Sequence, residues 1–223
     1  MPPVPVHRLK KAELVWLGTH RCRHSHTYLT HYNCYLEEHA DAQEREGYLD
    51  IETTNLQASY GIILCWCIYD AKNDIMHEGQ ITADDLASVH LDKRITQELI
   101  DCMRRFDRVY TFYGTKFDLP FIRTRAIVHG LDFPIFQTLF HKDVYYIVRN
   151  KFRLHSNKLV VACEVLLGKS DKTRITPDYW TRALMGHKES LDYILQHCRN
   201  DVTDLCKLHR KVEDYAGRPN TSI

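Results

Sequence analysis

Acidic side chains stand beside apolar residues in three separate segments of the chain. Asp50 and Glu52 lie two residues apart in YLDIETTNL. In a strand, residues i and i+2 project from the same face, so these carboxylates lie side by side. Two adjacent carboxylates repel each other, and near a core they require a compensating cation, for which hard divalent ions are suited. A strand that reaches the surface with both acids solvated explains the pair equally well.

Two further segments carry acids in settings that allow chemistry. Asp118 stands in YGTKFDLPFI, after an expected strand and at the entry to an expected helix. For a lone aspartate ahead of Pro120, a helix N-cap is the simpler interpretation. His197 and Asp201 lie four residues apart in HCRND, so on a helix they share one face. An isolated pair of this kind is more often a solvated helix surface.

The elements that must position these side chains follow from the apolar pattern. Three strands with short connections predict an antiparallel meander, and the alternation of helices and strands after it predicts a mixed α/β sheet flanked by helices. Strands are expected within 48–56, 60–70, 76–82, 108–114 and 135–148, and helices over 91–106, 119–130, 156–168 and 189–212.

Taken together, the segments resemble the DEDD superfamily of 3′–5′ exonucleases. DIETT, YGTKFDLPFI and HCRNDV are similar to its three motifs, and LHSNKLVVACEVLLGKSDK is similar to the stretch before the third. Within this superfamily, the chain resembles the stand-alone ribonuclease-H-like domains of bacteria and phages. The resemblance implies a ribonuclease-H-like fold over 48–215, preceded by a His/Cys-rich extension at 1–47 and followed by a flexible tail at 216–223.

The resemblance also implies roles for individual residues. Asp50, Glu52, Asp118 and Asp201 correspond to the ligands of two Mg²⁺ or Mn²⁺ ions, with Asp50 shared between both. His197 corresponds to the residue that orients or deprotonates the attacking water. The implied activity is 3′–5′ exonucleolytic hydrolysis of phosphodiester bonds.

Two positions depart from the family pattern. Tyr113 stands where the second motif commonly has asparagine. In the third motif, some members have a tyrosine four residues before the last aspartate, and others have a histidine five residues before it. Here His197 stands at the tyrosine position and Gln196 at the histidine position. The general base therefore follows less directly from the motifs than the metal ligands do.

Five of the fourteen histidines fall within residues 20–39. Cys22, His24, His31 and Cys34 form two ligand pairs, which predicts a tetrahedral Zn²⁺ site. A loop with solvated histidines is an equally good interpretation. The alternative ligands are His20, His26 and His39. The eight cysteines are irregularly spaced, and we expect reduced thiols.

A polyanionic substrate requires a basic surface. The segment from 142 to 158 is the candidate, with Tyr145, Tyr146 and Phe152 interleaved among its cations; strand core is the more common role of such aromatics. Its basic residues are Lys142, Arg149, Lys151, Arg153 and Lys158. The expected partner is DNA or RNA, bound at a single-stranded 3′ end.

Composition narrows the function classes. The formal net charge is +1, from 30 basic and 29 acidic residues, which excludes a polybasic protein. No apolar run approaches the ~20 residues of a membrane span, and no secretory signal is visible, so we expect a cytoplasmic protein, in the host if phage-encoded. The remaining alternatives are a structure-specific endonuclease, a non-catalytic nucleic-acid-binding module and a zinc-dependent binding protein.

Overall fold

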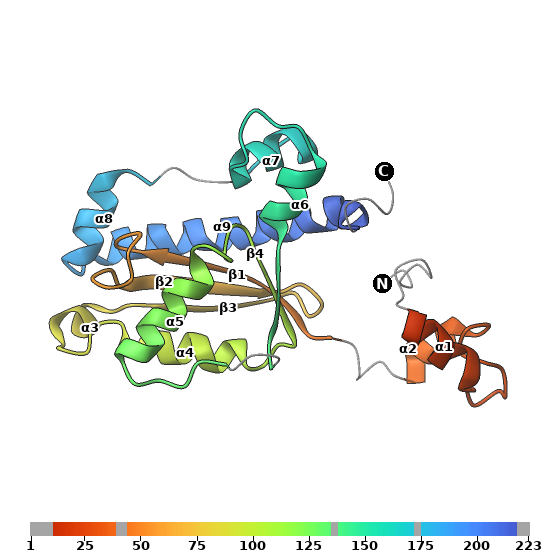
Figure 1. The fold of residues 1–223 in the computed structure, drawn as a ribbon. Coiled ribbons are helices and arrows are strands. Elements are labelled where there is room, and N and C mark those ends of the chain that lie inside the picture. Colours follow the sequence, from red (N-terminus) through yellow and green to blue (C-terminus); the bar gives the residue numbers. More distant parts are fainter. Residues whose placement is uncertain (1–10, 39–43, 135–137, 172–174, 218–223) are drawn as a thin grey trace. The chain divides into compact units, whose positions relative to one another are not determined.

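The computed structural model describes residues 11–38, 44–134, 138–171 and 175–217, and the chain divides into two compact units, Met1–Glu44 and Arg45–Ile223. In the larger unit a five-stranded sheet is flanked by helices (Figure 1). Its strands are β1 (Glu46–Thr53), β2 (Ile63–Asp70), β3 (Ile75–Gln80), β4 (Arg108–Thr111) and β5 (Phe140–Asp143). Its helices are α3 (Ala83–Ala87), α4 (Lys93–Met103), α5 (Asp118–Val128), α6 (Val144–Lys151), α7 (Leu159–Leu167), α8 (Pro177–Leu184) and α9 (Lys188–Val212), followed by a 3₁₀ turn at Glu213–Tyr215.

The sheet is mixed, with strand order β3-β2-β1-β4-β5. β1, β2 and β3 form the predicted antiparallel meander, whereas β4 and β5 run parallel to β1. β2 reads as an almost continuous apolar run because nearly all its side chains are buried under helices. The predicted mixed α/β sheet is therefore confirmed.

Helices cover both faces of this sheet. α9 runs along one face in contact with β1 and β2, and α4 lies on the opposite side against β2 and β3 (Figure 1). α4 buries Ile95, Leu99 and Met103, which recur at helical spacing. The long α9 contacts the meander and α7 together, so any side chain on its inner face is held against β1.

A buried ion pair fixes the helix that follows β4. Arg125 of α5 donates from Nε to Asp92 Oδ2 at 2.9 Å, and the backbone N–H of Ile63 donates to the same oxygen at 2.9 Å. Asp92, just before α4, is 0% exposed and Arg125 is 5% exposed. This contact joins the start of α4, the middle of α5 and the start of β2.

The chain enters the larger unit slightly before the expected start at residue 48. The backbone N–H of Arg45 donates to Asp107 Oδ2 at 2.7 Å, and β1 begins at Glu46. Most of the tail expected at 216–223 lies outside the described residues.

The smaller unit contains α1 (Lys11–Thr19) and α2 (Tyr32–Glu38). Between them a turn is closed by a bridge between Arg21 and Thr27. In the described parts of both units, no helix has the length and apolar character needed to cross a membrane.

Candidate active site

The first two acids lie near the end of the central strand β1. The alternation of buried and half-buried residues places Asp50 and Glu52 on one face, with Ile51 buried between them. The pairing with β2 is irregular between Glu52 and Thr53, as in a β-bulge, which re-aims side chains at a strand end. Because β4 runs parallel to β1, the loop after β4 reaches this same edge of the sheet.

Asp118 arrives at this edge as the first residue of α5. Its carboxylate Oδ1 accepts a hydrogen bond from the backbone N–H of Ile51 at 3.2 Å. Phe117, not Asp118, occupies the N-cap position, and no side chain caps this helix. The helix-cap interpretation is therefore wrong: the side chain is 3% exposed and turns toward β1.

Helix α9 contributes the third segment. His197 Nε2 lies 3.6 Å from Glu52 Oε1 and 3.8 Å from Asp201 Oδ2. One ligand atom from each of these three side chains lies within 4.8 Å of the others. The thiol of Cys198 donates to the backbone carbonyl of Asp50 at 3.4 Å, which holds this part of α9 against β1.

The structure shows which residue of the third motif lies beside the acids. Gln196 is exposed on α9, and its Nε2 donates to Asn200 Oδ1 at 2.9 Å. His197, in contrast, is 6% exposed and lies between two carboxylates. Of the two positions considered from the sequence, the one occupied by His197 faces the acids.

A pocket of about 590 Å³ opens beside the acids. Asp50 and Asp201 line it from β1 and α9, together with Phe112, Tyr113 and Tyr145. The opposite wall is formed by residues 156–160. The structure therefore brings all four predicted carboxylates to one edge of the sheet, although they come from positions up to 151 residues apart in the sequence.

The carboxylates gathered at this edge would be stabilised by a bound cation. Burial raises the pKa of Asp118 to about 7, and the nearby carboxylates of Asp143 and Asp201 add to the increase. Several acids gathered in a partly buried place, all offering hard oxygen ligands, fit Mg²⁺ or Mn²⁺. The donor set is therefore chemically suited to the metals that the sequence predicts.

Asp143 is a site residue that the sequence analysis did not identify. Its carboxylate accepts hydrogen bonds from the backbone N–H groups of Tyr113 at 2.8 Å, Thr115 at 2.9 Å and Tyr145 at 3.1 Å. It thus fixes the loop that leads to Asp118 and also caps α6. An aspartate directly before a helical apolar pattern was the available signal.

The backbone at Tyr113 explains why the family pattern commonly has asparagine there, but nothing in the structure explains the tyrosine of this chain. Tyr113 has φ +72°, in the left-handed region where asparagine and glycine are favoured. A Cβ on the following residue, Gly114, would lie 2.3 Å from Thr111 Oγ1, so glycine is required there. The ring of Tyr113 is half exposed and meets the Tyr145 ring edge-on, with centroids 4.8 Å apart.

Replacing Asp143 tests this positioning role. We expect Asp143→Ala to lower the free energy of unfolding by about 2–4 kcal/mol, because a helix cap and two loop hydrogen bonds are lost. Divalent-metal affinity should fall as well, since the loop before Asp118 is no longer fixed. Urea denaturation and Mn²⁺ titration measure the two effects. In Asp101→Ala, which removes an exposed acid paired with Arg104, both should stay near wild type; equal behaviour of the two variants would contradict the assignment.

The predicted basic residues are only partly gathered at the pocket. Lys158 lines it, and among the described residues it is the one cation of that lining. Arg149 and Lys151 lie on α6, Arg153 is exposed after it, and Lys142 is half-buried in β5. Tyr145 and Tyr146 belong to helix α6, so their interpretation as strand core is wrong.

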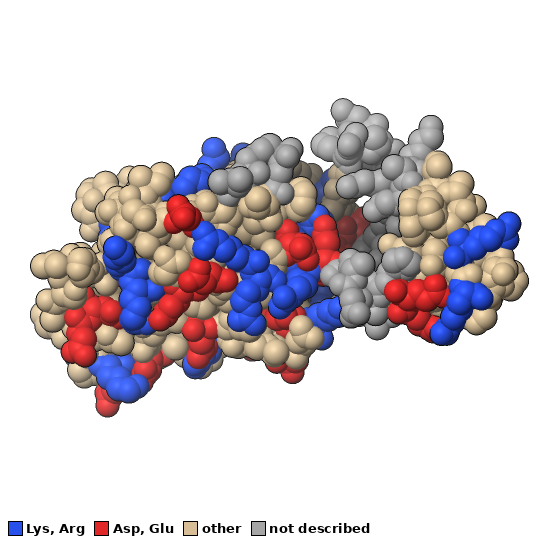
Figure 2. All heavy atoms as spheres, turned by 90° about the horizontal axis from the view of Figure 1, so that it is seen from below, with Lys and Arg blue, Asp and Glu red and all other residues tan. Residues whose placement is uncertain are grey.

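Another face of the molecule carries no uniform charge. In the view of Figure 2, basic and acidic side chains are interspersed over the larger unit. Exposed ion pairs on and beside α4 include Arg94–Glu98 and Arg104–Asp101. A continuous basic track for a polyanion is absent from what this face shows of the described residues.

The Cys/His residues form a second cluster, within the smaller unit. Ligand atoms of Cys22, His24, His31 and Cys34 all lie within 4.8 Å of one another. The structure thus gathers the four residues named first from the sequence. Of the alternative ligands, His39 lies outside the described residues.

Comparison with known proteins agrees with this architecture. A DNA polymerase of Methanocaldococcus jannaschii is 24% identical over an alignment of 131 residues, and the match covers 48% of this chain and 8% of that protein. The family B DNA polymerase of the archaeon Pyrobaculum calidifontis superposes with a TM-score of 0.61 at 14% identity, over 77% of this chain and 25% of that one. The chain therefore corresponds to only a small part of each. The model of the RNase_H superfamily matches residues 47–213, which include every element from β2 to α9, and the chain belongs to this superfamily.

Proposed function

We propose that this protein is a metal-dependent nuclease that removes nucleotides from the 3′ end of DNA or RNA. The observation that carries the proposal is the convergence of four carboxylates, from β1, α5 and α9, on one edge of the sheet. Membership of the RNase_H superfamily and the similarity to two DNA polymerases support a nucleic-acid substrate. The 3′–5′ direction rests on the motif resemblance.

The cofactor is Mg²⁺ or Mn²⁺, held by Asp50, Glu52, Asp118 and Asp201. When bound, such ions supply a more acidic water and neutralise charge on the phosphoryl oxygens and the leaving 3′ oxygen. A purely binding protein has no use for this donor set, because uncompensated carboxylates repel an anionic backbone.

The chain's own residues bind the substrate and handle the proton. His197 Nε2, which lies between Glu52 and Asp201, orients the attacking water and accepts its proton. The rings of Tyr113 and Tyr145 on the pocket wall stack with unpaired bases, and Lys158 at the same pocket pairs with a phosphate. The pocket's volume of about 590 Å³ accommodates a terminal nucleotide but not a duplex.

The test uses labelled single- and double-stranded DNA and RNA, incubated with Mg²⁺, with Mn²⁺ or with a chelator, and resolves the products by length. With a 5′ label, we expect a ladder that shortens progressively from the 3′ end and appears only with metal. Circular single strands and strands with a blocked 3′ end should remain intact.

Three results contradict the proposal in different ways. Cleavage of the circular or end-blocked strand assigns a structure-specific endonuclease on the same ligands. Absence of hydrolysis on all four polymers, with measurable binding, assigns a non-catalytic module. Equal activity in purified Asp50→Ala shows that the nuclease is a contaminant or that the site lies elsewhere.

A further inference from the structure

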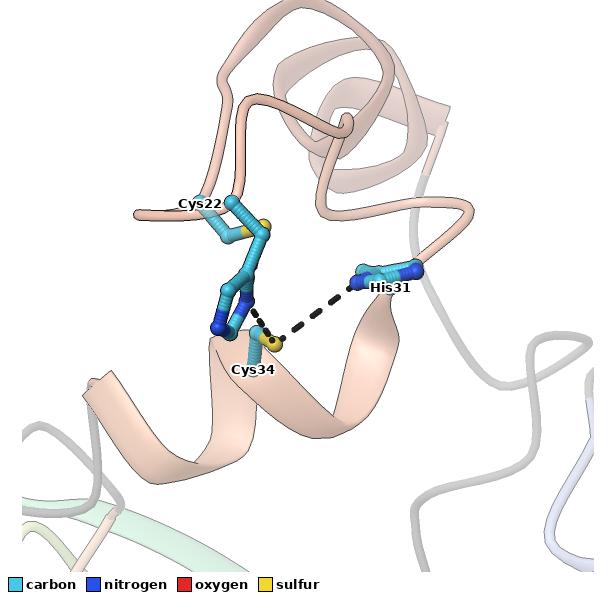
Figure 3. Close-up of side chains that lie close together, drawn as sticks. Cys22, His31 and Cys34 are labelled. Carbon is cyan, nitrogen blue, oxygen red and sulfur yellow. Dashed lines mark hydrogen bonds between the residues drawn. The ribbon is translucent and has the colours of Figure 1, made fainter.

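A compact cluster of soft ligands lies in the smaller unit and has no part in the proposed reaction. Cys34 Sγ lies 3.3 Å from His24 Nδ1 and 3.8 Å from His31 Nδ1, and Cys22 Sγ lies 3.9 Å from His24 Nδ1. In Figure 3, Cys22, His31 and Cys34 extend from different parts of the backbone toward one common point. Two sulfurs and two imidazole nitrogens thus surround a small volume.

These separations match a tetrahedral ion. With Zn–S near 2.3 Å and Zn–N near 2.0–2.1 Å, neighbouring ligand atoms of a tetrahedral site lie about 3.4–3.8 Å apart. The three sulfur–nitrogen distances of 3.3, 3.8 and 3.9 Å agree with this spacing. Thiols and imidazoles favour zinc over Mg²⁺ or Ca²⁺, which require oxygen ligands.

Each of the two ligand pairs lies on its own short segment of the backbone. Ser25 has φ +64°, and its N–H donates to the carbonyl of Cys22 at 2.9 Å, which produces a tight turn that carries Cys22 and His24. The N–H of Cys22 donates to the carbonyl of His26 at 2.9 Å and closes the turn. A strained serine in a short turn is maintained only where surrounding interactions enforce it.

The second pair comes from the start of α2. His31 directly precedes this helix and Cys34 is in its first turn, so the spacing of three residues puts both side chains on one face. The two pairs are joined through Glu38 near the end of α2, which accepts from the backbone N–H of Arg23 at 3.2 Å and from the Tyr28 hydroxyl at 2.8 Å.

The apolar core that the structure describes in this unit is small. Among its described residues, the buried apolar cluster consists of Leu17, Cys22 and Tyr28, with Tyr32, Cys34 and Tyr35 packed against it. Units of about 40 residues need disulfides, metals or oligomerisation to fold. Two of these six side chains are themselves candidate ligands, so an ion would stabilise the unit at the centre of its core.

We propose that Cys22, His24, His31 and Cys34 bind one structural Zn²⁺ that holds the smaller unit folded. The neighbouring histidines are engaged otherwise: His20 Nδ1 bonds with the carbonyl of Trp16 at 2.9 Å, and His26 packs its ring on His31 with centroids 4.1 Å apart. All four positions of the tetrahedron are filled by the chain, so the ion has no open position for catalysis.

Metal content of the full chain tests the site. Protein reconstituted with Zn²⁺ under reducing conditions and dialysed exhaustively against metal-free buffer should retain about one zinc per chain. The Cys22→Ser/Cys34→Ser variant should retain less than about a tenth of that, while His26→Ala, a matched histidine in the same turn, should retain the wild-type amount. Retention below about half an equivalent by the wild type would overturn the proposal.

Cobalt substitution identifies the ligands independently of stability. Co²⁺-loaded wild type should show thiolate-to-metal charge-transfer absorption and tetrahedral d–d bands, and both should be absent from the double variant. Unchanged bands in that variant place the metal elsewhere and reject the ligand set. The proposal also fails if the two thiols form a disulfide in the purified, unreduced protein and the reduced protein does not bind zinc. The cluster would then be an oxidation site.

Discussion

Replacing Asp118 with asparagine should abolish nuclease activity while making the metal-free protein more stable at neutral pH. Asparagine keeps an oxygen acceptor for the N–H of Ile51, which donates to Asp118 Oδ1 at 3.2 Å in the native chain. The negative charge, however, is gone, and with it one proposed metal ligand. We expect nucleotide release to fall about a thousandfold or more, since such ions contribute several kcal/mol to the transition state.

The stability gain follows from proton linkage. Asp118 has a pKa of about 7 in the folded chain, mainly because it is buried, against an ordinary value of 3.8. A buried acid with a raised pKa binds its proton more tightly when folded, so its contribution to stability is complete below about pH 4 and is lost as the pH rises toward 7. Between about pH 5 and pH 8, the wild type in chelator should lose about 2–3 kcal/mol relative to Asp118→Asn.

Denaturant titrations at these two pH values, with and without Mg²⁺, measure the effect. Asp204→Asn is the matched control: Asp204 is also buried, one turn along α9 from Asp201, but it accepts from the Ser170 hydroxyl at 2.8 Å and does not line the pocket. This control should keep activity of the wild-type order. An Asp118→Asn variant that retains activity, or one whose stability difference does not change with pH, would contradict the placement of Asp118 among the acids.

The sequence alone was sufficient for the parts of this site that depend on local periodicity. Alternation along β1 predicted that Asp50 and Glu52 share a face, and the four-residue spacing on α9 predicted that His197 and Asp201 do. Both features follow from the geometry of single elements. The placement of Asp118 beside them was expected only from the motif resemblance, and the structure achieves it through the parallel pairing of β4 with β1.

What local pattern could not supply was the role of residues whose partners are distant. Asp143 binds the N–H groups of Tyr113 and Thr115, 30 and 28 residues earlier in the chain, through the parallel pairing of β4 and β5. The run VYYIV after it has strong β propensity, yet the aspartate cap and tertiary packing make it helix α6. Helix α8 was missed although Thr176 and Pro177 form a standard helix start, because the segment around it is strongly polar.

The largest expected loss of stability is at the ion pair between Asp92 and Arg125. Asp92→Ala removes the acceptor of Arg125, of His129 Nε2 at 2.8 Å, and of the Ile63 N–H at 2.9 Å. The guanidinium, 5% exposed, would stay buried without its counter-charge. We expect the free energy of unfolding to fall by about 3–5 kcal/mol, as for other broken buried pairs.

A double-mutant cycle separates this electrostatic cost from simple loss of packing. Arg125→Met keeps most of the apolar stem, so Asp92→Ala combined with Arg125→Met should be about 2 kcal/mol more stable than the sum of the single losses predicts. The same cycle on Asp101 and Arg104, an exposed pair at 3.0 Å, should give a coupling within about 0.5 kcal/mol of zero. Arg125 and Asp118 belong to the same helix, α5, so the single variants should also weaken Mn²⁺ binding. Additive losses of stability together with unchanged Mn²⁺ affinity would show that the ion pair does not position α5.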